Sequence, residues 1–252
     1  MRRAALALLI GASALCAAPL RAQEGGRPPV GGVSSPVDAM IFYLARGPAG
    51  ACGENCSEWI AAEGVVQWDT HKRLIAFLER LEKRKLPVIL DVWEKSNFNV
   101  AVTLGRIIRD RGLDAIAGKT AVAQCAGKTE PQCFELKRGG VPLDAAVDAA
   151  VKCDFACVLM LAGGVRRTVP TAGEVVLSGM RIRNRLGLKV SDEHRTGLHS
   201  LFTDQFRLYL KQMGVSTEVA DIVDRNSESS GSTTRLAPDD LVRLRIVTEP
   251  SP

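Results

Sequence analysis

A repeated order of amphipathic helix followed by buried strand constrains the fold of this chain more than any other feature of its sequence. Apolar residues recur at three-and-four spacing from residue 74 to 81, which predicts a helix with Asp69 or Thr70 as its N-cap. Pro87 ends this helix. The continuous apolar run of residues 87–93 is typical of a strand that is covered on both faces. This pairing of elements favours a layered α/β sheet with crossover helices.

The same order continues along the chain. A strand pair is predicted at residues 39–45 and 57–66, and Gly112 is expected to end a second helix. Residues 125–140 are predicted as a cysteine-bearing loop. Further strands are expected at residues 113–118 and 168–180, with helices at residues 142–152, 155–163, 193–213 and 216–224 and a Ser-rich loop at 227–234.

The N-terminus has the pattern of a signal peptide. Arg2 and Arg3 precede an apolar run of residues 4–18, and small residues follow up to Ala22, where cleavage is expected. The run is shorter than the roughly 20 residues of a spanning helix, which favours cleavage over a retained anchor. Residues 1–22 are therefore predicted as a signal peptide, and the Gly-, Pro- and Ser-rich residues 23–36 as a flexible leader. The mature protein is expected to be periplasmic or secreted, with no membrane attachment.

The charge balance argues against two classes of partner. The whole chain carries 33 basic and 28 acidic residues, a net charge of +5. Cleavage after Ala22 removes Arg2, Arg3 and Arg21, which leaves 30 basic residues against 28 acidic ones. The mature chain has no long block of like charges. Nucleic acid and anionic membrane are therefore not expected partners.

Six cysteines remain after cleavage, and an even number in an exported protein favours disulfides. Sequence proximity suggests two local bridges, one joining Cys52 to Cys56 and one joining Cys125 to Cys133. No metal site is expected, because zinc sites usually use closer cysteine pairs or adjacent histidines. The histidines lie far from these pairs in the sequence, at His71, His194 and His199.

Cys153 and Cys157 leave two alternatives open. If both lay inside one helix, their Cβ atoms would be about 5–6 Å apart, too far for a disulfide. Either Cys153 precedes the helix, or the partners are Cys125 and Cys133. A thiolate at a helix N-terminus has a lowered pKa, so a catalytic cysteine is the competing hypothesis to a structural disulfide.

Three segments resemble exported members of the ClpP/crotonase superfamily, which fold as a spiral of β-β-α units. They are residues 56–66, 104–113 and 153–180, and the likeness spans roughly residues 56–187. The resemblance implies a ClpP/crotonase-like core at residues 37–192 and a C-terminal helical tail at 193–252. Because relatives commonly self-associate through their tail helices, it also implies a homo-oligomer.

The resemblance implies that the catalytic groups of the serine peptidases have been replaced. Relatives have a Cys-x-Ser-Ala-Cys pattern at the start of a helix, and Phe155 stands in place of the nucleophilic serine. Ser178 or Gly179 stands in place of the histidine. The glycines of the oxyanion loop are replaced by a segment with side chains, Trp93, Glu94, Lys95 and Ser96. Residue Asp224 matches the third member of the triad only loosely.

The predicted function is therefore non-catalytic, as a binding or structural homologue of serine peptidases with an unknown protein or peptide ligand and no cofactor. The Trp93 loop is expected to face Phe155, with the cleft between them packed shut. One alternative is a hydrolase with a relocated site, toward which His194 and His199 could approach from the tail; another is a thiol redox protein. Arg166 and Arg167 are expected at the surface or at a subunit contact.

Overall fold

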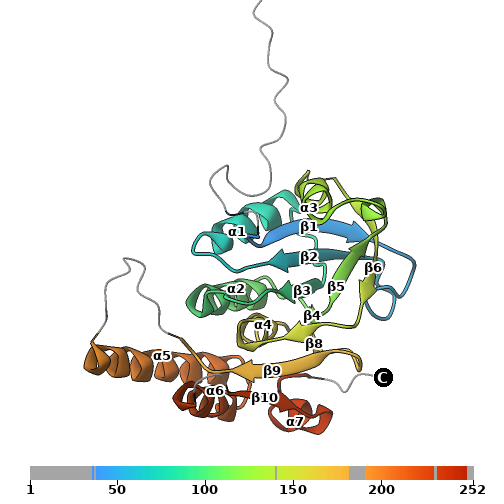
Figure 1. The fold of residues 1–252 in the computed structure, drawn as a ribbon. Helices are drawn as coiled ribbons and strands as arrows, with labels where there is room; N and C mark the ends of the chain where they lie inside the picture. The colour runs from blue at the N-terminus through green and yellow to red at the C-terminus, as the bar shows by residue number, and fades with distance from the viewer. Residues whose placement is uncertain (1–35, 37, 140, 182–190, 230–231, 249–252) are drawn as a thin grey trace, which may run out of the picture.

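The computed structural model describes residues 36, 38–139, 141–181, 191–229 and 232–248 (Figure 1). The predicted signal peptide and all of the leader except Pro36 lie outside these residues. The prediction of an α/β fold with a C-terminal helical region is confirmed.

A mixed sheet of seven strands forms the centre of the molecule, in the order β5-β6-β1-β2-β3-β4-β8. Strands β2, β3, β4 and β8 run parallel, and β1 is antiparallel to β2 and parallel to β6. The strands are β1 Ile41–Arg46, β2 Glu58–Gly64, β3 Val88–Val92, β4 Ala115–Ala117, β5 Lys119–Val122, β6 Leu143–Asp148 and β8 Arg167–Thr168.

The two faces of this sheet carry separate apolar cores. One core packs the even-numbered residues of β3 against helices α1 Thr70–Arg80, α2 Phe98–Asp110 and α4 Phe155–Leu161. The other lies beneath α3 Glu130–Arg138 and includes Tyr43, Trp59 and Ile89. Side chains alternate between the faces of a strand, so the central strands β1, β2, β3 and β4 contribute to both cores. The continuous apolar run of residues 87–93 reflects this double coverage.

Helices α2 and α4 approach closely because glycines lie at their crossing. A Cβ on Gly105 would come within 2.6 Å of the Leu159 carbonyl, and one on Gly163 would meet the Gly105 carbonyl at 2.0 Å. Tyr209 adds a fixed contact, since its hydroxyl donates to the Leu159 carbonyl at 2.7 Å. Gly105 and Gly163 therefore allow the two helices to pack at a distance that a side chain at either position would prevent.

Two secondary-structure predictions were wrong. Residues 142–152, predicted as a helix, form β6 and the short strand β7 Lys152–Cys153. β6 forms hydrogen bonds with β1 on one side and with β5 on the other, and it buries alternate residues, Leu143 and Ala145. This pairing outweighs the preference of the alanines for a helix. The predicted loop at residues 125–140 contains α3, which begins with a capping box at Thr129 and Gln132.

The C-terminal region packs beneath α4 (Figure 1). It contains α5 Asp192–Gln212, α6 Glu218–Glu228, β10 Thr233–Leu236 and α7 Pro238–Arg243. β10 pairs with β9 Glu174–Ser178, and β9 in turn pairs with β7 to complete a three-stranded sheet. The described residues of the predicted loop at 227–234 include the end of α6 and the start of β10, a third difference from the sequence pattern.

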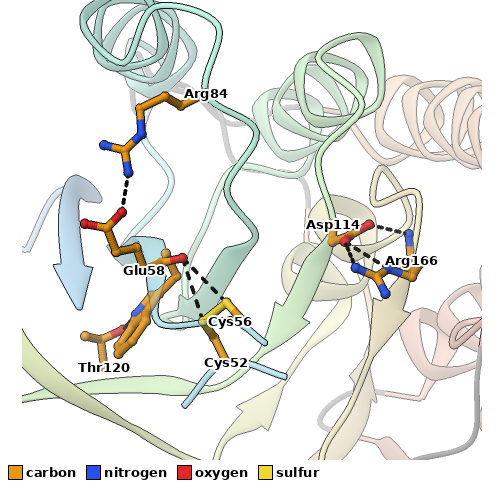
Figure 2. Close-up of a disulfide and its surroundings, with 8 residues drawn as sticks. Cys52, Cys56, Glu58, Arg84, Asp114, Thr120 and Arg166 are labelled. Atoms are coloured by element: carbon orange, nitrogen blue, oxygen red, sulfur yellow. Dashed lines mark hydrogen bonds and ion pairs between the residues drawn. A yellow bond between two sulfur atoms is a disulfide. The ribbon is translucent and has the colours of Figure 1, made fainter. Parts of the chain in front are cut away.

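Arg167 ties this region to the large sheet. Its guanidinium is 5% exposed and donates to the carbonyls of Ile246, Met213 and Arg245 at 3.0–3.1 Å. The prediction that Arg167 lies at the surface was wrong, because these carbonyls replace water as its acceptors. Arg166 is exposed as expected and binds Asp114 at 2.7 Å, as Figure 2 shows.

Three disulfides use all six cysteines of the predicted mature chain. Cys52–Cys56 and Cys125–Cys133 are the two local bridges that the spacing indicates. Figure 2 shows the Cys52–Cys56 bridge beside Glu58, the first residue of β2. The Glu58 carboxylate forms an ion pair with Arg84. The bridge fixes the β1–β2 connection, where two glycines have positive φ, at Gly50 and Gly53.

Candidate functional site

The start of α4 is the position at which the sequence resemblance predicts a replaced nucleophile. Seven consecutive apolar residues, 155–161, are all buried, so this helix passes through the centre of the core. Asp154 is its N-cap, and its Oδ1 accepts the Cys157 N–H at 3.1 Å. Phe155 is the first helical residue, and its side chain is completely buried.

Three phenyl rings surround this helix start. Phe155 meets Phe98 of α2 at 5.2 Å and Phe206 of α5 at 5.4 Å between ring centroids, both edge to face. Phe98 and Phe206 themselves lie 6.2 Å apart. Such pairs add about 0.5–1.5 kcal/mol each beyond the area that they bury. Phe155 is therefore the centre of an aromatic cluster that joins α2, α4 and α5.

The cysteines beside Phe155 form the third disulfide. Cys153 lies in β7, before the helix begins, and its Cα is 5.1 Å from that of Cys157. This geometry settles the two alternatives left by the sequence in favour of Cys153 preceding the helix. Both residues are completely buried. A disulfide has no thiolate, so the catalytic-cysteine hypothesis has no support in this structure.

The loop after β3 is held in place by its own polar groups. The Ser96 hydroxyl donates to the Trp93 carbonyl at 2.7 Å and accepts the Val66 N–H at 2.9 Å. Lys95 has a φ of 67°, and Glu94 pairs with Lys152 at 3.1 Å. The side chains of residues 94–96 border the cleft described below.

The loop after β3 borders the same cleft as the start of α4 through Glu94 and Lys95, but Trp93 itself does not face Phe155 as expected. Trp93 continues the odd-numbered face of β3 and packs against Phe134 of α3, with ring centroids 6.3 Å apart. It therefore lies on the opposite side of the sheet from Phe155. Phe98, five residues further along the chain, provides the aromatic contact that was expected of Trp93.

A cleft of about 850 Å³ opens beside the aromatic cluster, so the expectation of a closed site was wrong. Two rings of the cluster, Phe98 and Phe206, line the cleft, and Phe155 is buried behind them. Strand β9 contributes Val176 and Ser178, and Gly179 follows them at the site of the expected histidine. The remaining lining residues come from the loop before α1, the loop after β3, the start of α4 and the tail: Val66, Gln67, Trp68, Glu94, Lys95, Ser96, Asn97, Phe98, Asn99, Lys152, Asp154, Met180, Arg181, Phe202, Phe206, Asn226, Ser227, Ser232 and Thr233.

Charge in the cleft is mixed and partly shielded from water. Burial raises the pKa of Asp154, and the nearby Glu94 raises it further. The N–H groups of Cys157 and Ala156 and the ammonium of Lys152 act against this rise. The cleft is therefore lined by an exposed ion pair, Glu94 with Lys152, and by the partly buried carboxyl group of Asp154, whose pKa is raised.

None of the three histidines is among the residues that line the cleft. His199 on α5 pairs through Nδ1 with Asp224 Oδ1 at 3.2 Å, and Asp224 also accepts from Thr203 and Arg207. The other ring nitrogen, Nε2, is buried and has no hydrogen-bond partner in the described part of the chain. His194 is exposed at the start of α5, and His71 is half-buried on α1. Within the described ranges, no group of three His, Cys, Asp or Glu side chains is arranged for a metal ion.

Sequence reasoning missed the tail residues that line the cleft. Phe202 and Phe206 lie four residues apart on one face of α5, a spacing that marks a buried helix face but does not identify what it covers. Asn226 of α6 donates to the Leu177 carbonyl at 2.9 Å and so fixes α6 against β9.

No protein-family model and no curated protein matches this chain. Among the helices that the structure describes, none is long and apolar enough to cross a membrane.

Proposed function

We propose that this chain is an exported ClpP/crotonase-like protein that binds an extended peptide segment of a partner protein without cleaving it. The observation that carries the proposal is the buried ring of Phe155, which packs behind Phe98 and Phe206 of an open cleft of about 850 Å³. A phenyl ring can neither attack a carbonyl carbon nor give a proton to a base. A cleft of this size is within the range of ligand-binding sites.

The other catalytic parts are missing from the same cleft. Ser178 and Gly179 stand where the resemblance expects a histidine, and neither can act as a base near neutral pH. The loop of residues 93–96 carries side chains in place of the glycines that expose backbone donors. Each such loss costs on the order of 10²-fold or more in rate. Peptide hydrolysis by the inherited mechanism is therefore not expected.

The edge of β9 favours an extended peptide as the ligand. The Glu174 N–H donates to the Val151 carbonyl, so alternate residues of β9 direct their backbone groups toward β7. β7 ends at Cys153, opposite Val175. The Val176 carbonyl and the backbone groups of Ser178 therefore point past the end of β7, at a position where no described strand pairs with them. A peptide strand can add to such an edge through main-chain hydrogen bonds.

The walls of the cleft suit such a segment. Phe202, Phe206 and Met180 supply an apolar side, whereas Glu94 and Lys152 supply charges of both signs at the edge. An extended peptide presents alternate side chains to opposite sides, so apolar and polar residues in alternation would match both walls.

A pair of variants at one residue tests this binding mode. Decapeptides selected from a random display library against the wild-type protein would be labelled and titrated by fluorescence polarisation. Ser178→Pro removes one backbone donor and is expected to weaken binding about tenfold, the equivalent of one hydrogen bond. Ser178→Ala keeps the backbone and is expected to bind as the wild type does. Equal affinity of both variants, at equal helix and strand content by circular dichroism, would contradict strand addition.

A hydrolase with a relocated site is the second candidate. The observation in its favour is the His199–Asp224 pair, in which a carboxylate orients an imidazole and leaves Nε2 unpaired among the described groups. A serine-directed activity probe distinguishes the two candidates. Labelling of the wild type that is lost in His199→Ala would favour the hydrolase, and absence of labelling favours the binding protein.

Self-association through the tail is a separate part of the proposal. Leu201 and Leu208 lie two turns apart on α5, and their side chains are 52% and 57% exposed. Figure 1 shows the N-terminal end of this helix projecting beyond α6. An apolar pair on a projecting helix suits contact with a second copy of the chain. Leu201→Glu is expected to lower the molar mass measured by light scattering if this contact forms.

The proposed location is the periplasm or the extracellular space. The N-terminal signal pattern supports it, and the three disulfides are consistent with an oxidising compartment. The same disulfides leave no resting dithiol among residues 23–252, which argues against the thiol redox alternative.

A further inference from the structure

A group of ionisable side chains is enclosed on the face of the large sheet opposite the cleft. Glu63 of β2 and Asp91 of β3 are register partners in a parallel strand pair. Their side chains leave the same face of the sheet, and the two strands lie about 4.8 Å apart. This face also carries Trp59 and Ile89 of the second core, so the two carboxyl groups stand side by side at the edge of an apolar layer.

Lys137 of α3 reaches down to this pair from the other side of the layer. Its Nζ lies 2.8 Å from Glu63 Oε1 and 2.6 Å from Oε2. Lys137 is 7% exposed and Glu63 is 9% exposed. The Tyr43 hydroxyl donates to Glu63 Oε2 at 2.9 Å, and the Lys137 ammonium lies 5.7 Å from the centre of the Tyr43 ring. The amine is therefore held against the Tyr43 ring with little access to water.

Asp91 is the carboxyl group beside this ion pair. It is the register partner of Glu63 on a strand about 4.8 Å away, and the charges of both Glu63 and Lys137 act on it. Burial raises the pKa of Asp91, and Glu63 raises it further, against a hydrogen bond from Trp93 and the charges of Lys119 and Lys137. Asp91 is thus protonated in a larger fraction of molecules than an exposed aspartate would be, and the protonated form is the one that can lose its hydroxyl as water.

We propose that Lys137 and Asp91 join in an intramolecular amide bond, with Glu63 as the group that moves the protons. The Lys137 ammonium gives one proton to the Glu63 carboxylate, and the neutral amine attacks Cγ of the protonated Asp91. The new C–N bond forms as the nitrogen loses a second proton, which joins the departing hydroxyl as water. Glu63 ends as the neutral acid, and no oxidant, reductant or cofactor is required.

The bond would link β3 to α3 across the second core. It is independent of the cleft, since these three residues lie on the other face of the sheet. A buried ion pair is costly to maintain because both charges lose their hydration, and conversion to an amide removes that cost. Lys137 and Glu63 are almost fully buried beside the second core, so little water is available there to hydrolyse the bond once it has formed.

The mass of the wild-type protein tests the proposal without any variant. After export and full reduction of the disulfides, the mature protein is expected about 18 Da below its sequence mass, the loss of one water. A tryptic digest is expected to contain residues 86–95 linked to residues 129–138, with no cleavage after Lys137. The full sequence mass would overturn the proposal. A linked peptide that contains Glu63 or Lys119 in place of Asp91 or Lys137 would overturn the assignment.

Four variants separate the roles of the residues. Glu63→Gln and Lys137→Arg are both expected to show the full sequence mass, the first because the proton carrier is lost and the second because the nucleophile is lost. Asp91→Asn is expected to form the same bond with loss of ammonia, about 17 Da. Lys119→Arg keeps all three groups and is expected to retain the bond. A bond that persists in Lys137→Arg, or one that disappears in Lys119→Arg, would contradict these roles.

Discussion

Replacing Arg167 with methionine tests whether the tail is fastened to the large sheet through this one buried side chain. Burial lowers the pKa of Arg167 to about 10, with Arg109 contributing, so the guanidinium remains charged at neutral pH. It donates to four carbonyls, those of Ala162, Met213, Arg245 and Ile246. The carbonyls of Ala162 and Met213 also accept hydrogen bonds from Arg109. Among the described residues, the carbonyls of Arg245 and Ile246 have Arg167 as their hydrogen-bond donor and no other.

The expected magnitude follows from the Ile246 carbonyl, because Ile246 is buried whereas Arg245 is exposed and its carbonyl can reach water. Leaving a buried acceptor without a donor costs about 1–3 kcal/mol, so Arg167→Met is expected to destabilise the fold by about 1–3 kcal/mol. Methionine keeps most of the apolar contacts of the arginine side chain, so the change in stability reports mainly the loss of the guanidinium hydrogen bonds. Arg166→Met is the matched control: its side chain is 68% exposed, and its pair with Asp114 is worth about 0–1 kcal/mol.

Urea denaturation measures the difference between these neighbours. The midpoint of Arg167→Met is expected to fall well below that of Arg166→Met, and limited proteolysis is expected to remove α7 first. Equal midpoints would refute the reasoning, because they would mean that the carbonyls around Arg167 find water without cost.

Three further predictions concern the site. Phe155→Ser is expected to lose about 3–5 kcal/mol of stability, as other removals of buried rings do, and to gain no casein hydrolysis; measurable hydrolysis would contradict the account of the missing base and donors. Thiol titration of the unreduced mature protein is expected to find no free thiol, and removing the Cys153–Cys157 bridge by a double serine substitution is expected to cost about 2 kcal/mol. Finally, the raised pKa of Asp154 means that the folded state takes up a proton before the unfolded state as the pH falls toward 3.8. Stability relative to Asp154→Asn is therefore expected to rise with acidification through that window, and a fall measured by denaturation at several pH values would refute the assignment.

The sequence predicts the layers of this fold better than its contacts. The apolar runs around β3 and the three-and-four spacing of α1 and α2 depend on local patterns, and the structure confirms those elements. The segment of residues 142–152 failed because its alanines favour a helix in isolation, while pairing with β1 and β5 selects a strand.

The same limit applies to the site. The position of Phe155 at a helix start followed from the Cys-x-x-x-Cys pattern, but the direction of Trp93 required counting alternate residues from Ile89 along β3. Arg167 is indistinguishable in sequence from its exposed neighbour Arg166. Its burial depends on carbonyls about 45–80 residues away in the chain, which no local pattern reveals.

Titration of the isotopically labelled wild-type protein with a selected decapeptide, followed by amide NMR, tests the central claim most directly. The account predicts that the largest shifts fall at Val176, Ser178 and the turns carrying Phe98 and Phe206, and that the peptide is recovered intact. Shifts confined to another face of the molecule, or a peptide cleaved during the titration, would contradict it.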